Sequence, residues 1–251
     1  MEYIRIGSGK KALVMLPGLA LKSTLGAGEA IARQYAAFKD YSIYLFDERE
    51  GVEEGYSLRD RADHAAADMR ALGLEKACVF GASMGGMVGQ YLAIDHPELV
   101  ERLFLSATCS RMNPGAEEVL TRWKAEAASG QTELLIDDLI QSIYSPAVAK
   151  AYGPAIREGM GQVSEEEINR FIFLTEAILK VNTYEELDRM TCPVFAVGAL
   201  GDRVLTARGT EEMAAKLGCA FYLYGEEYGH GVYDEAPDHV ERIKAFFEGG
   251  E

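Results

Sequence analysis

The chain has 251 residues, 48% hydrophobic and 26% charged, proportions that are ordinary for a globular protein with one sizeable domain. Its formal net charge of −15 at pH 7 argues against nucleic acid and anionic membrane surfaces as partners, because both attract basic patches. No apolar run is long enough for a transmembrane helix, and no signal-peptide core follows Met1. The four cysteines (Cys78, Cys109, Cys192 and Cys219) lack metal-site spacing, and a reducing, cytoplasmic location is the simplest interpretation.

Short apolar runs separated by helical patterns follow one another along most of the chain. Strands are predicted over residues 3–6, 12–16, 42–46, 77–80, 103–107, 194–198 and 220–224. Helices are predicted over residues 29–38, 57–72, 84–94, 210–217 and 237–247. Strands that alternate with helices indicate the α/β class, with a mostly parallel, doubly wound sheet of about seven strands.

The alternation is interrupted after the strand at residues 103–107. Helical patterns without a convincing strand occupy residues 117–128, 132–143, 146–160 and 164–181. This insertion leaves and rejoins the chain beside the carboxyl edge of the sheet, where ligands bind in such folds. The sequence therefore predicts a core of residues 1–109 and 190–251, with residues 110–189 forming a helical cap over the binding site.

A possible nucleophile lies at the junction between the strand at 77–80 and the helix at 84–94. The pattern there is Gly81-x-Ser83-x-Gly85. A serine on such a sharp turn needs small neighbours, because bulky flanking side chains would collide. The turn lifts the hydroxyl above the sheet edge, next to unpaired N–H groups at the helix N-terminus. The alternative is a glycine-rich turn with a helix-capping serine, but the strand before and the helix after favour the nucleophile.

A serine hydroxyl needs a base, and the base needs a carboxylate to hold it. His230 lies in a glycine-flanked loop after the last strand, whereas the other three histidines lie in or at the ends of helices. Asp202 follows the strand at 194–198 and also lies at the carboxyl edge. Its alternative role is to cap the next helix. We expect His230 Nε2 to contact Ser83 Oγ and Asp202 to bind His230 Nδ1.

The negative oxygen of a tetrahedral intermediate needs two N–H donors. Met84, directly after Ser83, is predicted to supply one backbone N–H. The other is predicted to come from Leu19, because Pro17-Gly18 in the loop after the strand at 12–16 allows close approach. No residue cluster offers metal ligation or nucleotide binding, so no metal or organic cofactor is expected.

The order Ser83, Asp202, His230, with these placements, resembles the α/β-hydrolase superfamily over nearly the whole chain. The Ser-Met-Gly-Gly continuation and the helical cap resemble its branch of small esterases, carbon–carbon bond hydrolases and haloperoxidase-like enzymes. The resemblance implies a metal-free serine hydrolase, most simply a carboxylic-ester hydrolase with an acyl-enzyme. Carbon–carbon bond hydrolysis, acyl transfer and a receptor-like binding role with a residual triad remain alternatives.

The predicted cap should set the choice of substrate. Its large side chains Trp123, Tyr144 and Phe171 are predicted to line an apolar pocket, although packing between cap helices would also explain each of them. The expected partner is therefore a small, mostly apolar molecule. The sequence names neither the physiological substrate nor the oligomeric state.

Overall fold

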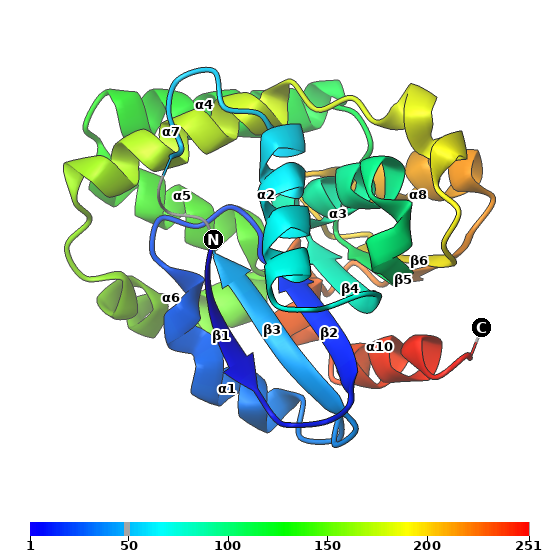
Figure 1. Ribbon diagram of the computed structural model, residues 1–251. Coiled ribbons are helices and arrows are strands. Elements are labelled where there is room, and N and C mark those ends of the chain that lie inside the picture. The colour runs from blue at the N-terminus through cyan, green and yellow to red at the C-terminus, as the bar shows by residue number, and fades with distance from the viewer. Residues whose placement is uncertain (48–50, 251) are drawn as a thin grey trace.

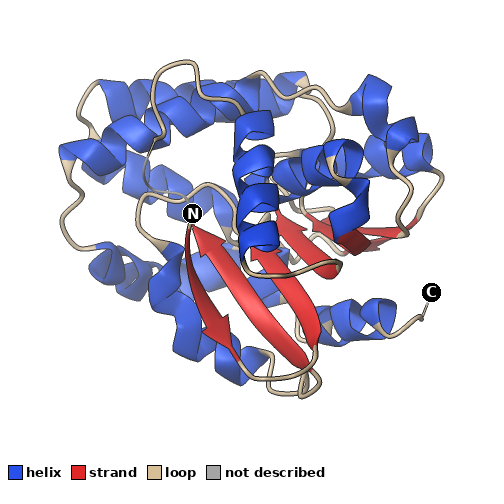
Figure 2. Cartoon of the chain, viewed as in Figure 1, coloured by secondary structure: helices blue, strands red, loops and turns tan. Residues whose placement is uncertain are grey.

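The computed structural model of the chain describes residues 1–47 and 51–250. Within them lies one seven-stranded sheet, red in Figure 2, with the order β1-β3-β2-β4-β5-β6-β7. β1 runs antiparallel to β3, and all other neighbouring strands are parallel. The strands are β1 (Glu2–Ile6), β2 (Lys11–Leu16), β3 (Tyr41–Asp47), β4 (Ala77–Ala82), β5 (Val100–Ser106), β6 (Val194–Ala199) and β7 (Ala220–Tyr224). The predicted class and strand number are confirmed.

Helices cover both faces of this sheet (Figure 1). The core helices are α1 (Gly28–Gln34), α2 (Leu58–Ala71), α3 (Met84–Asp95), α8 (Thr206–Leu217), α9 (Val232–Glu235) and α10 (His239–Phe247). Between β5 and β6 come α4 (Pro114–Ala128), α5 (Thr132–Ile143), α6 (Pro146–Met160) and α7 (Glu165–Leu179). Short 3-10 turns are η1 (Thr24–Ala27), η2 (Pro97–Leu99) and η3 (Tyr184–Arg189). In Figure 1, α4 and α7 cross above the sheet rather than joining it.

Alternation along the strands produces two hydrophobic cores. In β2, Val14 and Leu16 belong to the core that α2, α3 and α8 cover. Leu13 and Met15, one residue out of phase, belong to the core that α10 and the segment after α1 cover. Successive strand side chains point to opposite faces, so a strand buried on both sides is apolar throughout. This explains why the strands appear in the sequence as continuous apolar runs.

Two helix boundaries differ from the sequence prediction by four residues. α1 ends at Gln34 instead of residue 38, because Tyr35 and Phe38 turn inward and become buried. α8 begins at Thr206, four residues before the predicted start. The turn before it is built by the Asp202 carboxylate, which accepts hydrogen bonds from two backbone N–H groups. Tertiary contacts therefore override the local apolar pattern at both places.

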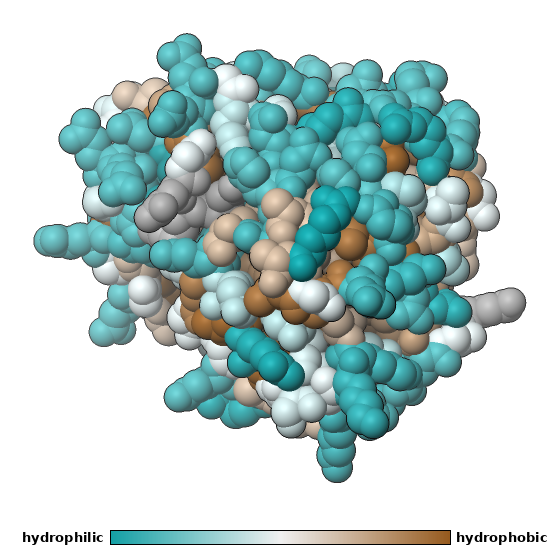
Figure 3. All heavy atoms as spheres, viewed as in Figure 1, coloured by the Kyte–Doolittle hydropathy of each residue, from teal (hydrophilic) through white to brown (hydrophobic). Residues whose placement is uncertain are grey.

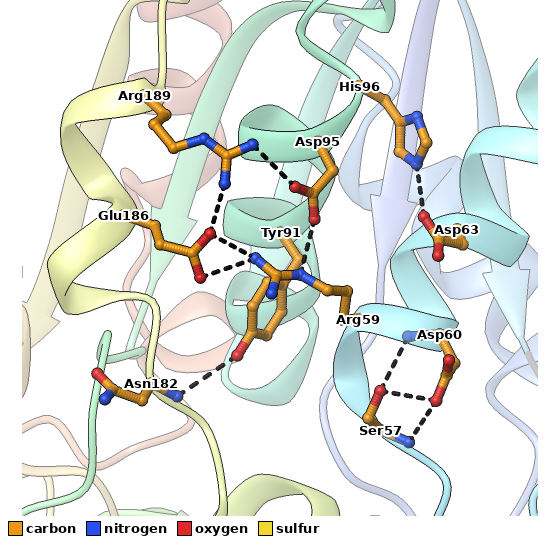
Figure 4. Close-up of polar contacts among 10 residues, drawn as sticks. All are labelled: Ser57, Arg59, Asp60, Asp63, Tyr91, Asp95, His96, Asn182, Glu186 and Arg189. Carbon is orange, nitrogen blue, oxygen red and sulfur yellow. Dashed lines mark hydrogen bonds and ion pairs between the residues drawn. The ribbon is translucent and has the colours of Figure 1, made fainter.

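An ion-pair cluster joins α2, α3 and η3 (Figure 4). Arg59 Nε donates to Asp95 at 2.8 Å, and the same guanidinium donates to both carboxylate oxygens of Glu186 at 2.7 and 2.8 Å. Arg189 also donates to Asp95, at 3.3 Å. The Arg59 guanidinium carbon lies 4.7 Å from the centre of the Tyr91 ring, within range of a cation–π contact. The cluster therefore fastens the chain to the core where it returns from the inserted helices.

Much of the face seen in Figure 3 carries hydrophilic side chains, in keeping with the high charge. Among the described residues, no helix is both long and apolar enough to cross a membrane. The four cysteines form no disulfide.

Candidate active site

Ser83 lies on the strained turn that the sequence predicts. Its backbone has φ 52° and ψ −120°, between the end of β4 and the start of α3. A Cβ added to Gly81 would lie 2.5 Å from the Gly85 carbonyl oxygen, and one added to Gly85 would lie 1.9 Å from the Leu16 carbonyl oxygen. Both distances are too short for real Cβ atoms. Gly81 is therefore needed for the end of β4 to pass the first turn of α3, and Gly85 is needed for that turn to pack against the end of β2.

The structure brings Ser83, His230 and Asp202 together. Ser83 Oγ lies 2.9 Å from His230 Nε2, and His230 Nδ1 lies 2.9 Å from the Asp202 carboxylate. His230 and Asp202 are buried, and Ser83 is half-buried. This geometry lets His230 accept the Ser83 proton while Asp202 orients the imidazole.

Asp202 is held in its ionised form. Burial by itself raises the pKa of this carboxyl. The adjacent His230 and the N–H groups of Val204 and Leu205, which donate to Oδ1 at 2.8 and 3.1 Å, outweigh burial and hold the pKa below its ordinary value. The other carboxylate oxygen faces His230. Asp202 thus has both predicted arrangements: it contacts the imidazole and also starts the turn into α8.

The loops that carry Asp202 and His230 are tied to the end of α5. The Gly231 N–H donates to the Ile143 carbonyl oxygen at 2.7 Å, and Arg203 donates to the Tyr144 carbonyl oxygen at 2.7 Å. The Glu235 carboxylate accepts from the Ser145 N–H at 2.8 Å. Arg203 and Glu235 were not predicted from the sequence, where only their closeness to Asp202 and His230 marks them. The inserted helices therefore help to position the loops of the core.

The two predicted oxyanion donors lie close to the nucleophile. A Cβ added to Gly18 would lie 3.3 Å from Ser83 Cβ and 3.8 Å from Ser83 Oγ, so the loop that carries Leu19 passes directly beside the serine. Met84 opens α3, where N–H groups have no acceptor in a preceding turn. Neither the Leu19 nor the Met84 N–H forms a hydrogen bond with any described residue. Both are therefore free to bind an oxyanion.

A cavity of about 370 Å³ adjoins Ser83. Its lining includes Gly18 and Ala82, the immediate neighbours of Ser83, together with Ile140 and Tyr144 from α5 and Met160 from α6. Most of the other lining side chains are also apolar. The cavity thus lies between the carboxyl edge of the sheet and the inserted helices, where the sequence predicts a substrate pocket.

The predicted pocket residues have different positions. Tyr144 lines the cavity, as expected. Trp123 and Phe171 do not line it: they are 2% and 0% exposed and belong to the hydrophobic core that joins α4 to α7. The role predicted for these two residues is therefore corrected to packing. Their helical spacing could not distinguish the two roles, because both require an inward-facing apolar side chain.

No group of three or more His, Cys, Asp or Glu side chains in the described part of the chain could hold a metal ion.

Comparisons with known proteins agree with this architecture. Residues 12–237 match the family described as "alpha/beta hydrolase fold". A protein of Enterobacter cloacae named "Putative carbamate hydrolase RutD" is 21% identical over 239 residues, covering 92% of this chain and 88% of that protein.

Two solved structures have a similar fold. MGS-M2, an alpha/beta hydrolase enzyme from a deep-sea metagenome library, has a TM-score of 0.88 at 17% identity and covers 100% of this chain and 94% of its own. The enol-lactonase of Burkholderia xenovorans has a TM-score of 0.84 at 18% identity, with coverage of 98% and 96%. With the family match over most of its length, the chain belongs to the alpha/beta hydrolase fold family.

Proposed function

We propose that the protein is a serine hydrolase that cleaves small carboxylic esters through an acyl-enzyme. The observation that carries the proposal is the chain of two 2.9 Å contacts from Ser83 through His230 to Asp202, beside a largely apolar cavity. Membership of the family and a relative named as a carbamate hydrolase support hydrolytic chemistry in general.

In the first half of the reaction, Ser83 Oγ attacks the ester carbonyl carbon while its proton passes to His230 Nε2. The carbonyl oxygen becomes negative and is stabilised by the N–H groups of Leu19 and Met84. Asp202 stabilises the imidazolium that forms. When the intermediate collapses, the carbon–oxygen bond to the alcohol breaks, and the alcohol leaves with the proton from His230.

In the second half, His230 takes a proton from water, and the resulting nucleophile attacks the acyl carbonyl. The second intermediate collapses as Ser83 Oγ leaves and regains its proton from His230. A carboxylic acid is released, and the enzyme returns to its starting state.

A carbamate ester is the second candidate substrate. It presents the same carbonyl to Ser83, and the relative from Enterobacter cloacae carries that activity in its name. We rank it below a simple ester because the cavity beside Ser83 is mostly apolar. Carbon–carbon bond hydrolysis and acyl transfer use the same nucleophile and remain alternatives, as does a binding role.

A fluorophosphonate probe tests the nucleophile directly. We expect one adduct per chain on Ser83 and none in Ser83→Ala. A series of p-nitrophenyl esters of increasing chain length, run beside p-nitrophenyl carbamates, then identifies the substrate class. The absence of both labelling and turnover in the folded wild-type protein would contradict the proposed function and favour a binding role.

A further inference from the structure

The cavity beside Ser83 contains one acidic side chain, Asp234. Among the described residues that line it, Asp234 is the only acid and Lys22 the only base. Lys22 already has a partner, because its ammonium lies 2.7 Å from the Glu167 carboxylate. The carboxylate of Asp234 forms no hydrogen bond or ion pair with any described side chain or backbone group. The mechanism derived above does not use it.

Asp234 lies in α9, four residues after His230, and three tyrosines share the cavity wall with it. These are Tyr35, Tyr144 and Tyr233. Burial, followed by the negative charge of Asp234, raises the pKa of each of these tyrosines. Asp234 is exposed to solvent where it lines the cavity.

An ionised carboxylate in such surroundings lacks a counter-ion. A cation that binds beside Asp234 gains a charge-assisted hydrogen bond to a carboxylate that has no other partner among the described residues. Aromatic faces also attract cations, through the negative charge at the centre of the ring. A carboxylate that shares a cavity wall with three tyrosines therefore favours an ammonium group and repels a carboxylate group on the substrate.

We propose that the cavity selects substrates bearing a protonated amine, which Asp234 binds through a charge-assisted hydrogen bond among the three tyrosines. This inference rests on the proposed ester hydrolysis and names its substrate class: an amine-bearing ester. Asp234 is thus a specificity residue, and an acid-bearing ester of the same size is a poor substrate.

The charge of Asp234 depends on pH. Burial, followed by the nearby Glu235, raises the pKa of Asp234 to about 6. The preference for an ammonium group is therefore present at pH 8 and fades as the pH falls through about 6. The other ionisable groups around the cavity are Tyr35, Tyr144 and Tyr233 on its wall, Lys22 with Glu167, and His230 with Asp202 at the catalytic end.

The test compares two esters of nearly equal shape, p-nitrophenyl 4-(aminomethyl)benzoate and p-nitrophenyl 4-ethylbenzoate. We expect the wild-type protein to prefer the ammonium ester in kcat/KM by about tenfold, the scale of one hydrogen bond to a charged group. Asp234→Asn should lower this ratio by about tenfold, mainly through KM, and Asp234→Glu should restore part of it. Both esters use the same nucleophile and the same base, so effects on the triad cancel from the ratio.

Glu211→Gln is the matched control, because it removes one carboxylate from the exposed face of α8 and should leave the ratio unchanged. If Asp234→Asn hydrolyses both esters with the wild-type ratio, the inference is wrong while the proposed function stands.

A binding measurement distinguishes failure of the proposed amine preference from failure of the proposed ester hydrolysis. If the wild-type protein hydrolyses neither ester, calorimetry on Ser83→Ala compares 4-ethylbenzylamine with 4-ethylbenzyl alcohol. Amine binding that is about tenfold tighter, and that is lost on adding Asp234→Asn, supports the inference without catalysis. Equal binding of the two compounds overturns it.

Discussion

Ser83 adopts a backbone conformation that favours glycine, so the nucleophile should reduce the stability of the fold. Its φ of 52° and ψ of −120° lie outside the regions that L-residues normally occupy. Such a conformation costs about 1–3 kcal/mol in a residue with a side chain. We therefore compare Ser83→Gly with Ser83→Ala. Both variants lose the hydroxyl and its contact with His230, so that loss cancels from the comparison.

The expected difference follows from two opposing terms. Relief of strain favours the glycine variant by about 2 kcal/mol, the middle of the range for such residues. The greater freedom of glycine in the unfolded chain favours the alanine variant by about 0.7 kcal/mol. Ser83→Gly should therefore be more stable than Ser83→Ala by about 1 kcal/mol. For a chain of this length, that difference raises the melting temperature by about 2–4 °C.

Urea unfolding of both variants, with thermal melts alongside, measures this difference. Both should have lost nearly all turnover. Glu211, exposed in the interior of α8, is the control position: Glu211→Ala should be more stable than Glu211→Gly by about 1 kcal/mol, the ordinary order in a helix. If Ser83→Gly is less stable than Ser83→Ala, which is the order expected at position 211, the backbone of Ser83 is not strained.

Three further outcomes are expected. Asp202→Asn should lower kcat about 10⁴-fold, because His230 loses its carboxylate partner. The melting temperature should change little, because the Asn side chain can still accept a hydrogen bond from the Val204 N–H. If steady-state kinetics show a decrease in kcat of less than tenfold, Asp202 is not part of the triad. Arg59→Ala should lower the free energy of unfolding by about 1–2 kcal/mol, and this decrease should be smaller in high salt. Arg33→Ala is the control: it removes only the exposed ion pair with Glu29 and should leave urea unfolding unchanged. Burial lowers the pKa of His239 to about 3, so the unfolded chain binds an extra proton between about pH 3 and 6.5 and stability falls as the pH drops through this window. Between pH 7.5 and 5, the free energy of unfolding measured in urea should fall by about 2 kcal/mol less in His239→Gln than in the wild type. If the free energy of unfolding falls equally with pH in both proteins, His239 is not the group responsible.

Part of the site could be predicted from local features of the sequence. Glycines at 81 and 85 mark a turn too tight for side chains, whatever packs around it. The position of each polar residue just after an apolar strand places it at the carboxyl edge, because parallel strands all end on the same side. Ser83, Asp202 and His230 each follow a strand and were therefore expected at one edge, and the structure has them in contact.

The sequence by itself also determined the α/β class, the seven strands and the inserted helices, because alternating apolar runs and capping signals are local features. Only the tertiary structure decided which inward-facing residues reach the cavity. Tyr144 lines it, whereas Trp123 and Phe171 pack inside the inserted helices, since periodicity defines the apolar face of a helix but not what lies opposite. Asp234 gave no sequence signal, because Tyr35 and Tyr144, which line the same cavity, come from elements distant in the chain.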